Sequence, residues 1–81
     1  MTIKLFIKKD CPRCPAAKHA VEGFDGVQVF DVGDIEGLAE ASFYSIMATP
    51  TVLLLDGNGN EVYGWRGEAP EPDLLRELIA Q

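Results

Sequence analysis

The two cysteines of this chain, Cys11 and Cys14, are separated by two residues and lie between segments of different periodicity. Residues 3–7 largely alternate between apolar and basic side chains, which is the period-two pattern of a strand. Residues 12–23 place small and apolar side chains at helical spacing, on a stripe that includes Ala17 and Val21. The pattern therefore predicts a thiol pair at the junction where a strand ends and a helix begins.

A thiol pair at such a junction is typical of a dithiol/disulfide switch. A thiolate at a helix N-terminus is stabilised by the unpaired N–H groups of the first turn and by the helix dipole. Positive charge is added by three nearby cations, Lys8, Lys9 and Arg13. We therefore expect Cys11 to be an exposed, reactive thiol that attacks a disulfide, and Cys14 to resolve the mixed disulfide.

The start of this helix is constrained by two prolines. Pro12 suits the first helical turn, because its φ is preset and it has no N–H to leave unpaired. Pro15 conflicts with a helix capped by Cys11, because the fourth position donates the first intrahelical hydrogen bond. We therefore expect Pro12 to cap a helix that runs to about residue 23.

The rest of the chain divides into short elements separated by turn residues. The patterns predict strands at residues 27–32, 51–55 and 61–65, a hairpin turn at 56–60, a helix at 35–45 and a last helix after Pro70 and Pro72. Residues 51–55 are continuously apolar, as in a strand buried on both faces. Asp34 is the expected cap of the middle helix, and Gly37 is expected to weaken it.

Side chains in three of these elements fall on recognisable faces. The residues of the middle helix that fall in helical register are Ile35, Leu38, Ser42 or Phe43, and Ile46. Strand alternation places Glu61, Tyr63 and Trp65 on one face of the last strand. The last helix is expected to bury a stripe of Leu74, Leu75, Leu78 and Ile79.

The order is β-α-β-α-β-β-α in one domain, residues 1–81, of the α/β class. We expect both β-α-β crossovers to join parallel neighbours and the hairpin to add an antiparallel strand, giving a four-stranded mixed sheet flanked by three helices. The net charge is −6 and the sequence pI is near 4.5. That charge argues against nucleic acid or an anionic membrane as a partner. Without a membrane span or a secretory leader, a cytoplasmic monomer is expected.

Two motifs in this order carry a family resemblance. Cys-Pro-Arg-Cys ends the first strand, and Ala-Thr-Pro-Thr at 48–51 opens the third. Together they resemble the thioredoxin superfamily, and the short length is similar to glutaredoxin. Residues 11–18 and 46–51 look like the small glutaredoxin-sized thioredoxins of archaea and anaerobic bacteria. The resemblance covers essentially the whole chain.

The resemblance implies a thioredoxin fold and an enzyme that reduces protein disulfides, with no cofactor beyond the redox-active cysteine pair. It implies that Cys11 attacks, that Cys14 resolves and that Pro50 follows a cis peptide bond. The substrate chain would contact Pro12, Arg13, Thr49, Pro50 and Gly67, and Lys8 would tune the thiolate. The implied partners are protein disulfides and a thioredoxin-reductase-type enzyme.

The chain departs from the family pattern at three places. Asp10 stands where thioredoxins have a Trp, and Leu5 stands where they have a buried acid. The proton-accepting role of that acid is therefore vacant. Residues 65–68 do not reproduce the Gly-Gly pair and Asp with which glutaredoxins hold glutathione, so we expect glutathione to be a poor electron donor.

Three alternatives use the same thiols. The chain could be a glutathione-dependent glutaredoxin, or an interaction domain whose thiols report redox state. It could also be a metal or iron–sulfur module, since a Cys-x-x-Cys pair begins many zinc sites. Only His19 adds a ligand at useful spacing, so a metal would need ligands from a second copy or from glutathione. We expect no metal and place His19 on the surface.

Overall fold

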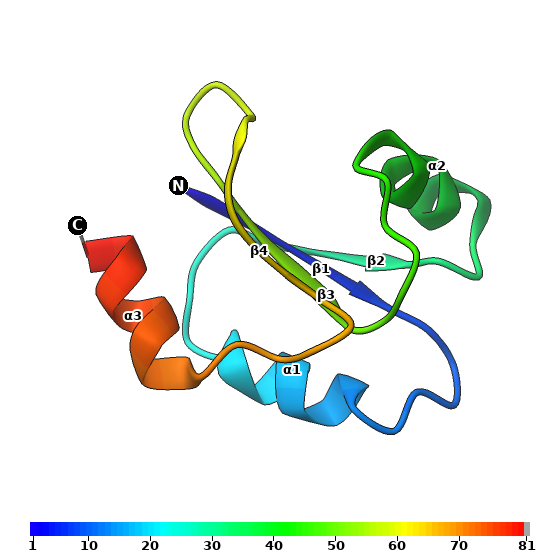
Figure 1. Ribbon diagram of the computed structural model, residues 1–81, viewed down its shortest axis with the longest axis horizontal. Coiled ribbons are helices and arrows are strands. Elements are labelled where there is room, and N and C mark those ends of the chain that lie inside the picture. Colours follow the sequence, from blue (N-terminus) through cyan, green and yellow to red (C-terminus); the bar gives the residue numbers. More distant parts are fainter. Residues whose placement is uncertain (81) are drawn as a thin grey trace.

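The computed structural model describes residues 1–80, and Gln81 lies outside the described range. The elements follow the predicted order: β1 (Thr2–Ile7), α1 (Cys14–Ala20), β2 (Val27–Asp31), α2 (Ile35–Phe43), β3 (Thr51–Leu55), β4 (Glu61–Arg66) and α3 (Pro72–Ala80). The strands form one sheet in the order β2-β1-β3-β4 (Figure 1). Within the described chain no helix is both long and apolar enough to cross a membrane.

The sheet separates two apolar layers. On one face, α1 and α3 cover a cluster that includes Ile3, Leu5, Val52 and Leu54. On the other face, α2 covers a smaller cluster of Phe6, Ala41, Leu53 and Leu55. All five residues of β3 are buried, which confirms the prediction of a strand covered on both faces.

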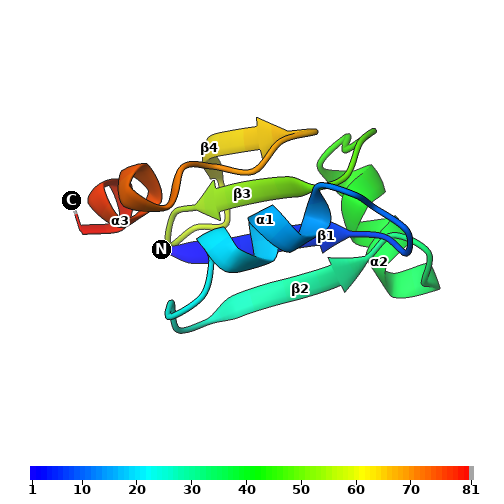
Figure 2. The same ribbon diagram turned by 90° about the horizontal axis from the view of Figure 1, so that it is seen from below.

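The second crossover was predicted wrongly. β1 and β2 are parallel, as expected, but β3 is antiparallel to β1, with Thr51 opposite Phe6 and Leu55 opposite Thr2. The reason is the position of α2, which lies near the C-terminal ends of β1 and β2 (Figure 2). Because α2 does not carry the chain back along the sheet, β3 begins at the end where β1 stops.

The first helix begins later and ends earlier than predicted. Its N-cap is Arg13, not Pro12, and Cys14 is its first residue, with Pro15 in the first turn. Pro15 needs no donor there, because the N–H groups of the first turn are unpaired in any helix. Residues 21–23 form turns rather than a continuation of the helix.

The buried face of α2 is made by its small residues. Asp34 occupies the N-cap position, as predicted, although its side chain makes no capping hydrogen bond. The residues that the helix buries are Gly37 and Ala41. Two large apolar side chains of the predicted register face outward, with Ile35 89% exposed and Phe43 78% exposed, whereas Ile46, beyond the end of the helix, packs against the α2-side cluster. The buried face must consist of small residues because the helix packs very closely against the end of β2. A Cβ on Gly37 would overlap the main-chain carbonyl of Asp31.

A charged contact also holds α2 on the sheet. The Lys4 ammonium, on β1, forms an ion pair with Glu40 of α2 and also lies over two aromatic rings. Its distances to the ring centroids are 5.4 Å for Phe30 and 5.2 Å for Tyr44. Both are within the range of a cation–π interaction.

A β-bulge in the hairpin changes which side chains of β4 share a face. Leu54 pairs with Tyr63, but Leu55 pairs with Glu61, so Val62 is the extra residue. The rings of Tyr63 and Trp65 stack on each other. They lie on the side of the sheet that α1 and α3 cover, where Trp65 packs against the apolar cluster. The prediction that Glu61 joins them is wrong, because the bulge turns Glu61 to the opposite face.

The last helix confirms most of its predicted stripe. Leu75 and Leu78 are buried, and Ile79 packs against the same cluster. Leu74 is 41% exposed and is not part of the buried stripe.

Candidate active site

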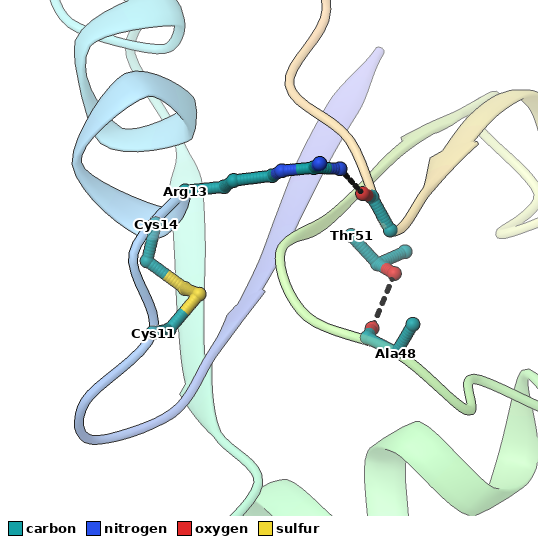
Figure 3. Close-up of a disulfide and its surroundings, with 6 residues drawn as sticks. Cys11, Arg13, Cys14, Ala48 and Thr51 are labelled. Carbon is teal, nitrogen blue, oxygen red and sulfur yellow. Dashed lines mark hydrogen bonds between the residues drawn. A yellow bond between two sulfur atoms is a disulfide. The ribbon is translucent and has the colours of Figure 1, made fainter.

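Cys11 and Cys14 form a disulfide at the N-terminus of α1, with their Cα atoms 5.4 Å apart (Figure 3). The prediction of an exposed Cys11 is wrong for this oxidised state, since Cys11 is only 9% exposed and Cys14 only 4%. Cys11 is nevertheless the more accessible of the two cysteines. A molecule that reacts with this disulfide therefore meets Cys11 first.

Cys11 lies in the turn before α1 rather than in its first turn. Its carbonyl accepts a hydrogen bond from the Cys14 N–H at 3.3 Å, and Cys14 is the first helical residue. Of the nearby cations, Lys8, Lys9 and Arg13 are exposed. The Arg13 side chain extends toward Gly67 rather than toward the sulfur atoms (Figure 3).

Three segments that are distant in sequence meet beside the disulfide. The Gly67 N–H donates to the Pro50 carbonyl at 2.9 Å, and Arg13 Nη1 donates to the Gly67 carbonyl at 3.5 Å. The Thr49–Pro50 peptide bond is cis, as predicted. The Thr51 hydroxyl donates to the Ala48 carbonyl at 2.8 Å and closes the turn that precedes β3.

A pocket of about 290 Å³ lies on the α2 side of this turn. Its lining is mainly apolar and includes Lys8, Leu38, Ile46, Met47 and Thr49. Met47 is 94% exposed, whereas Tyr44 packs on the α2-side cluster. Both side chains precede the cis bond in the chain, but of the two it is Met47 that lines the pocket. The Thr49 hydroxyl is buried without a hydrogen-bond partner in the described chain.

The other predicted residues take the following places. Pro12 is exposed in the turn between the cysteines. Leu5, which occupies the position of the family's buried acid, lies in the core. His19 is on the surface, as predicted, with its Nδ1 3.3 Å from the Glu22 carboxylate. Residues 1–80 contain no group of three or more His, Cys, Asp or Glu side chains placed to hold a metal ion.

The comparisons with known proteins agree with this geometry. No model of a known protein family matches the chain. A thioredoxin from Methanocaldococcus jannaschii is 40% identical over an alignment of 83 positions, which covers 95% of this chain and 89% of the relative. The chain belongs to the thioredoxin superfamily.

Solved structures extend the family likeness to the fold. Thioredoxin 1 from Thermosipho africanus aligns with a TM-score of 0.73 at 22% identity, over 99% of this chain and 92% of that one. NrdH-redoxin from Escherichia coli, a glutaredoxin-like protein, aligns with a TM-score of 0.64 at 30% identity, over 96% of this chain and 95% of that one. The predicted thioredoxin fold is confirmed, and the general activity of this family member is thiol–disulfide oxidoreduction.

One part of the site was missed from the sequence. Arg66, at the end of β4, forms a two-pronged ion pair with Glu61 and also donates to the Tyr44 carbonyl. The hydrogen bonds from Arg66 lower the pKa of the Glu61 carboxyl, and Glu61 in turn raises the pKa of Arg66. The sequence gives no sign of the pair, because residues five apart in a regular strand lie on opposite faces.

Proposed function

We propose that this protein reduces disulfides in other proteins through its Cys11/Cys14 dithiol. The Cys11 thiolate attacks one sulfur of the target disulfide, forms a mixed disulfide and releases the other target sulfur as a thiolate. Cys14, as thiolate, then attacks Cys11, which restores the Cys11–Cys14 disulfide and leaves the target with two reduced sulfurs. Two electrons pass from the protein to the target.

The observation that carries this proposal is the meeting of three backbone segments around a disulfide in a thioredoxin-superfamily chain. The turn at Cys11, the cis Thr49–Pro50 segment and Gly67 are linked by the hydrogen bonds at Pro50 and Gly67. An extended target chain would lie along Thr49 and Pro50, with Pro12, Arg13 and Gly67 at its margins. The roles of these residues follow from the family resemblance and from this placement.

The proposed electron donor is a thioredoxin-reductase-type enzyme, and no bound cofactor is required. The similarity to NrdH-redoxin supports this choice, because that glutaredoxin-like protein has a thioredoxin-like activity profile. A cellular dithiol must be kept reduced to serve as a reductant, so the cytoplasm is the proposed compartment. We propose that the protein acts as a monomer.

Insulin-disulfide reduction tests the proposal. Wild-type protein with dithiothreitol as the donor is expected to precipitate the insulin B chain faster than dithiothreitol alone, and Cys11→Ser is expected to abolish the gain. Cys14→Ser is expected to trap the mixed disulfide. A wild-type rate equal to that of dithiothreitol alone would refute the proposal, and metal in anaerobically purified protein would favour the metal-binding alternative.

A further inference from the structure

The Arg66 side chain connects β4 to the C-terminus of α2. Its Nη1 and Nη2 donate to the two carboxylate oxygens of Glu61, each at 2.7 Å, and Nη2 also donates to the Tyr44 carbonyl at 3.1 Å. Tyr44 is the C-cap of α2, and the last turn of α2 has no basic residue of its own. Helix C-termini favour a nearby cation. Arg66 therefore supplies from β4 the charge that α2 lacks.

Two features of β4 make this contact possible. The bulge at Val62 brings Glu61 to the same face of the sheet as Arg66. Between them lies Gly64, where a Cβ would overlap both the Glu61 carboxylate and Arg66 Nη1. Glycine in a strand interior often marks a close approach of other groups. Here it leaves the space that the Glu61–Arg66 pair occupies.

Arg66 and the residue that follows it are bonded to the two ends of the segment that carries the cis bond, residues 44–50. At its first residue, the Tyr44 carbonyl is held by the Arg66 side chain. At its last residue, the Pro50 carbonyl is held by the N–H of Gly67, which directly follows Arg66 in the chain. Between these points, the Ile46 N–H donates to the Ala41 carbonyl at 2.8 Å. The Arg66 side chain thus holds the Tyr44 end of the segment, and the backbone of the next residue holds the Pro50 end.

We propose that the Glu61–Arg66 pair positions residues 44–50 for binding of the target protein and thereby sets the affinity for protein disulfides. This inference rests on the proposed function. Arg66 and Glu61 act as positioning residues, because their contacts are with the Tyr44 carbonyl and with each other. A small thiol reagent needs access only to Cys11, whereas a protein target needs the ordered segment. Loss of the pair should therefore raise KM for a protein disulfide and leave kcat nearly unchanged.

The test compares four variants. Arg66→Gln removes the guanidinium group that bonds both Glu61 and Tyr44. Arg66→Lys keeps the positive charge but not the planar two-pronged geometry. Gly64→Ala displaces the pair without changing any charge. Arg76→Gln is the matched control, since Arg76 pairs with Asp73 on the surface of α3 and the change in net charge is the same. Insulin reduction gives KM and kcat, and iodoacetamide alkylation of the reduced protein gives the reactivity of Cys11.

Arg66→Gln and Gly64→Ala should each raise KM by about three- to fivefold, the size expected for a partly exposed ion pair. The KM of Arg66→Lys should fall between the KM values of these two variants and that of the wild type. The KM of Arg76→Gln should match that of the wild type. Cys11 alkylation should stay within about twofold in every variant. Equal KM values for Arg66→Gln and Arg76→Gln, or an unchanged KM in Gly64→Ala, would overturn the inference.

Hydrogen exchange separates this inference from the proposed function. The Ile46 and Gly67 amides should exchange faster in Arg66→Gln than in Arg76→Gln, because both lie in the hydrogen bonds around the positioned segment. This measurement needs no enzymatic turnover. If the wild type reduces no protein disulfide, the proposed function fails, and the exchange rates alone decide whether the pair positions the segment. Equal exchange in the two variants would overturn that conclusion as well.

Discussion

Gly37 of α2 lies so close to Asp31 at the end of β2 that a Cβ at position 37 would overlap the Asp31 carbonyl. Alanine normally favours a helix by about 1 kcal/mol over glycine. Here the helix has no space for the extra methyl group without moving away from β2. The close approach also explains why α2 buries its small residues instead of its large apolar ones.

We therefore predict that Gly37→Ala destabilises the protein by about 1–3 kcal/mol, the usual cost of overpacking. Urea denaturation of the wild type and the variant measures the change. Gly57→Ala is the matched control, because nothing lies within 4 Å of a Cβ at that position, and its effect should stay within about 0.5 kcal/mol. A Gly37→Ala protein more stable than the wild type would contradict the packing argument.

Cys11 should be alkylated before Cys14 in the reduced protein. Cys11 is the more exposed of the two and lies in the turn that Lys8 and Lys9 precede, while Cys14 is buried at the start of α1. Iodoacetamide labelling across a range of pH, followed by peptide mapping, measures both sites. Half-maximal reaction of Cys11 is expected at lower pH than that of Cys14. Equal labelling of the two thiols at every pH would show that this placement has no effect on reactivity.

The Glu61–Arg66 pair should contribute stability that depends on pH. The hydrogen bonds from Arg66 hold the pKa of Glu61 below its ordinary value of 4.5. The unfolded chain therefore binds a proton at higher pH than the folded chain does. The contribution of the pair to the free energy of unfolding is fully present above pH 4.5, and it is lost as the pH falls through the lower pKa that Glu61 has in the folded protein.

Comparison of the wild type with Glu61→Gln at about pH 7 and about pH 3 tests this dependence. The variant should be less stable than the wild type by under about 1 kcal/mol at the higher pH, since the pair is partly exposed, and the difference should shrink at the lower pH. Asp73→Asn, which removes the acid of the exposed pair on α3, is the control. A difference that grows on acidification would have the wrong sign for this mechanism.

The features that could be predicted from the sequence are those with local causes. The Cys11 turn follows from two cysteines at a change of periodicity, β3 from a continuous apolar run, and the cap of α2 from Asp34 before a helical pattern. The cis bond at Pro50 was confirmed, although its prediction came from the family resemblance. Each of these signals lies within a few residues of the feature.

The features that were missed depend on contacts between distant segments. The direction of β3 is decided by where α2 lies against the sheet, and the buried face of α2 by the Asp31 carbonyl. The face of Glu61 is decided by a bulge in its pairing with β3. Strand periodicity predicts the opposite face, because one extra residue in a ladder is not visible in the alternation of side chains.

The electron source decides whether the chain works as a thioredoxin or as a glutaredoxin. A glutathione site must hold two carboxylates and an ammonium group, which requires free cations and an acid or backbone nest. Arg66, the last residue of β4, is already bound to Glu61 and to the Tyr44 carbonyl. Arg13 donates to the Gly67 carbonyl, and Lys8 in the pocket lining would meet at most one carboxylate.

We therefore predict efficient reduction by a thioredoxin-reductase-type enzyme and poor reduction by glutathione. Glu68 stands beside the Gly67 loop, so it would repel a carboxylate placed there, and the net charge of −6 further disfavours an anionic tripeptide. That long-range contribution is small at physiological salt, so the local contacts decide. Steady-state turnover on one protein disulfide should be measured with each donor in turn. Efficient turnover with millimolar glutathione, and none with a thioredoxin-reductase-type flavoenzyme, would reverse the assignment.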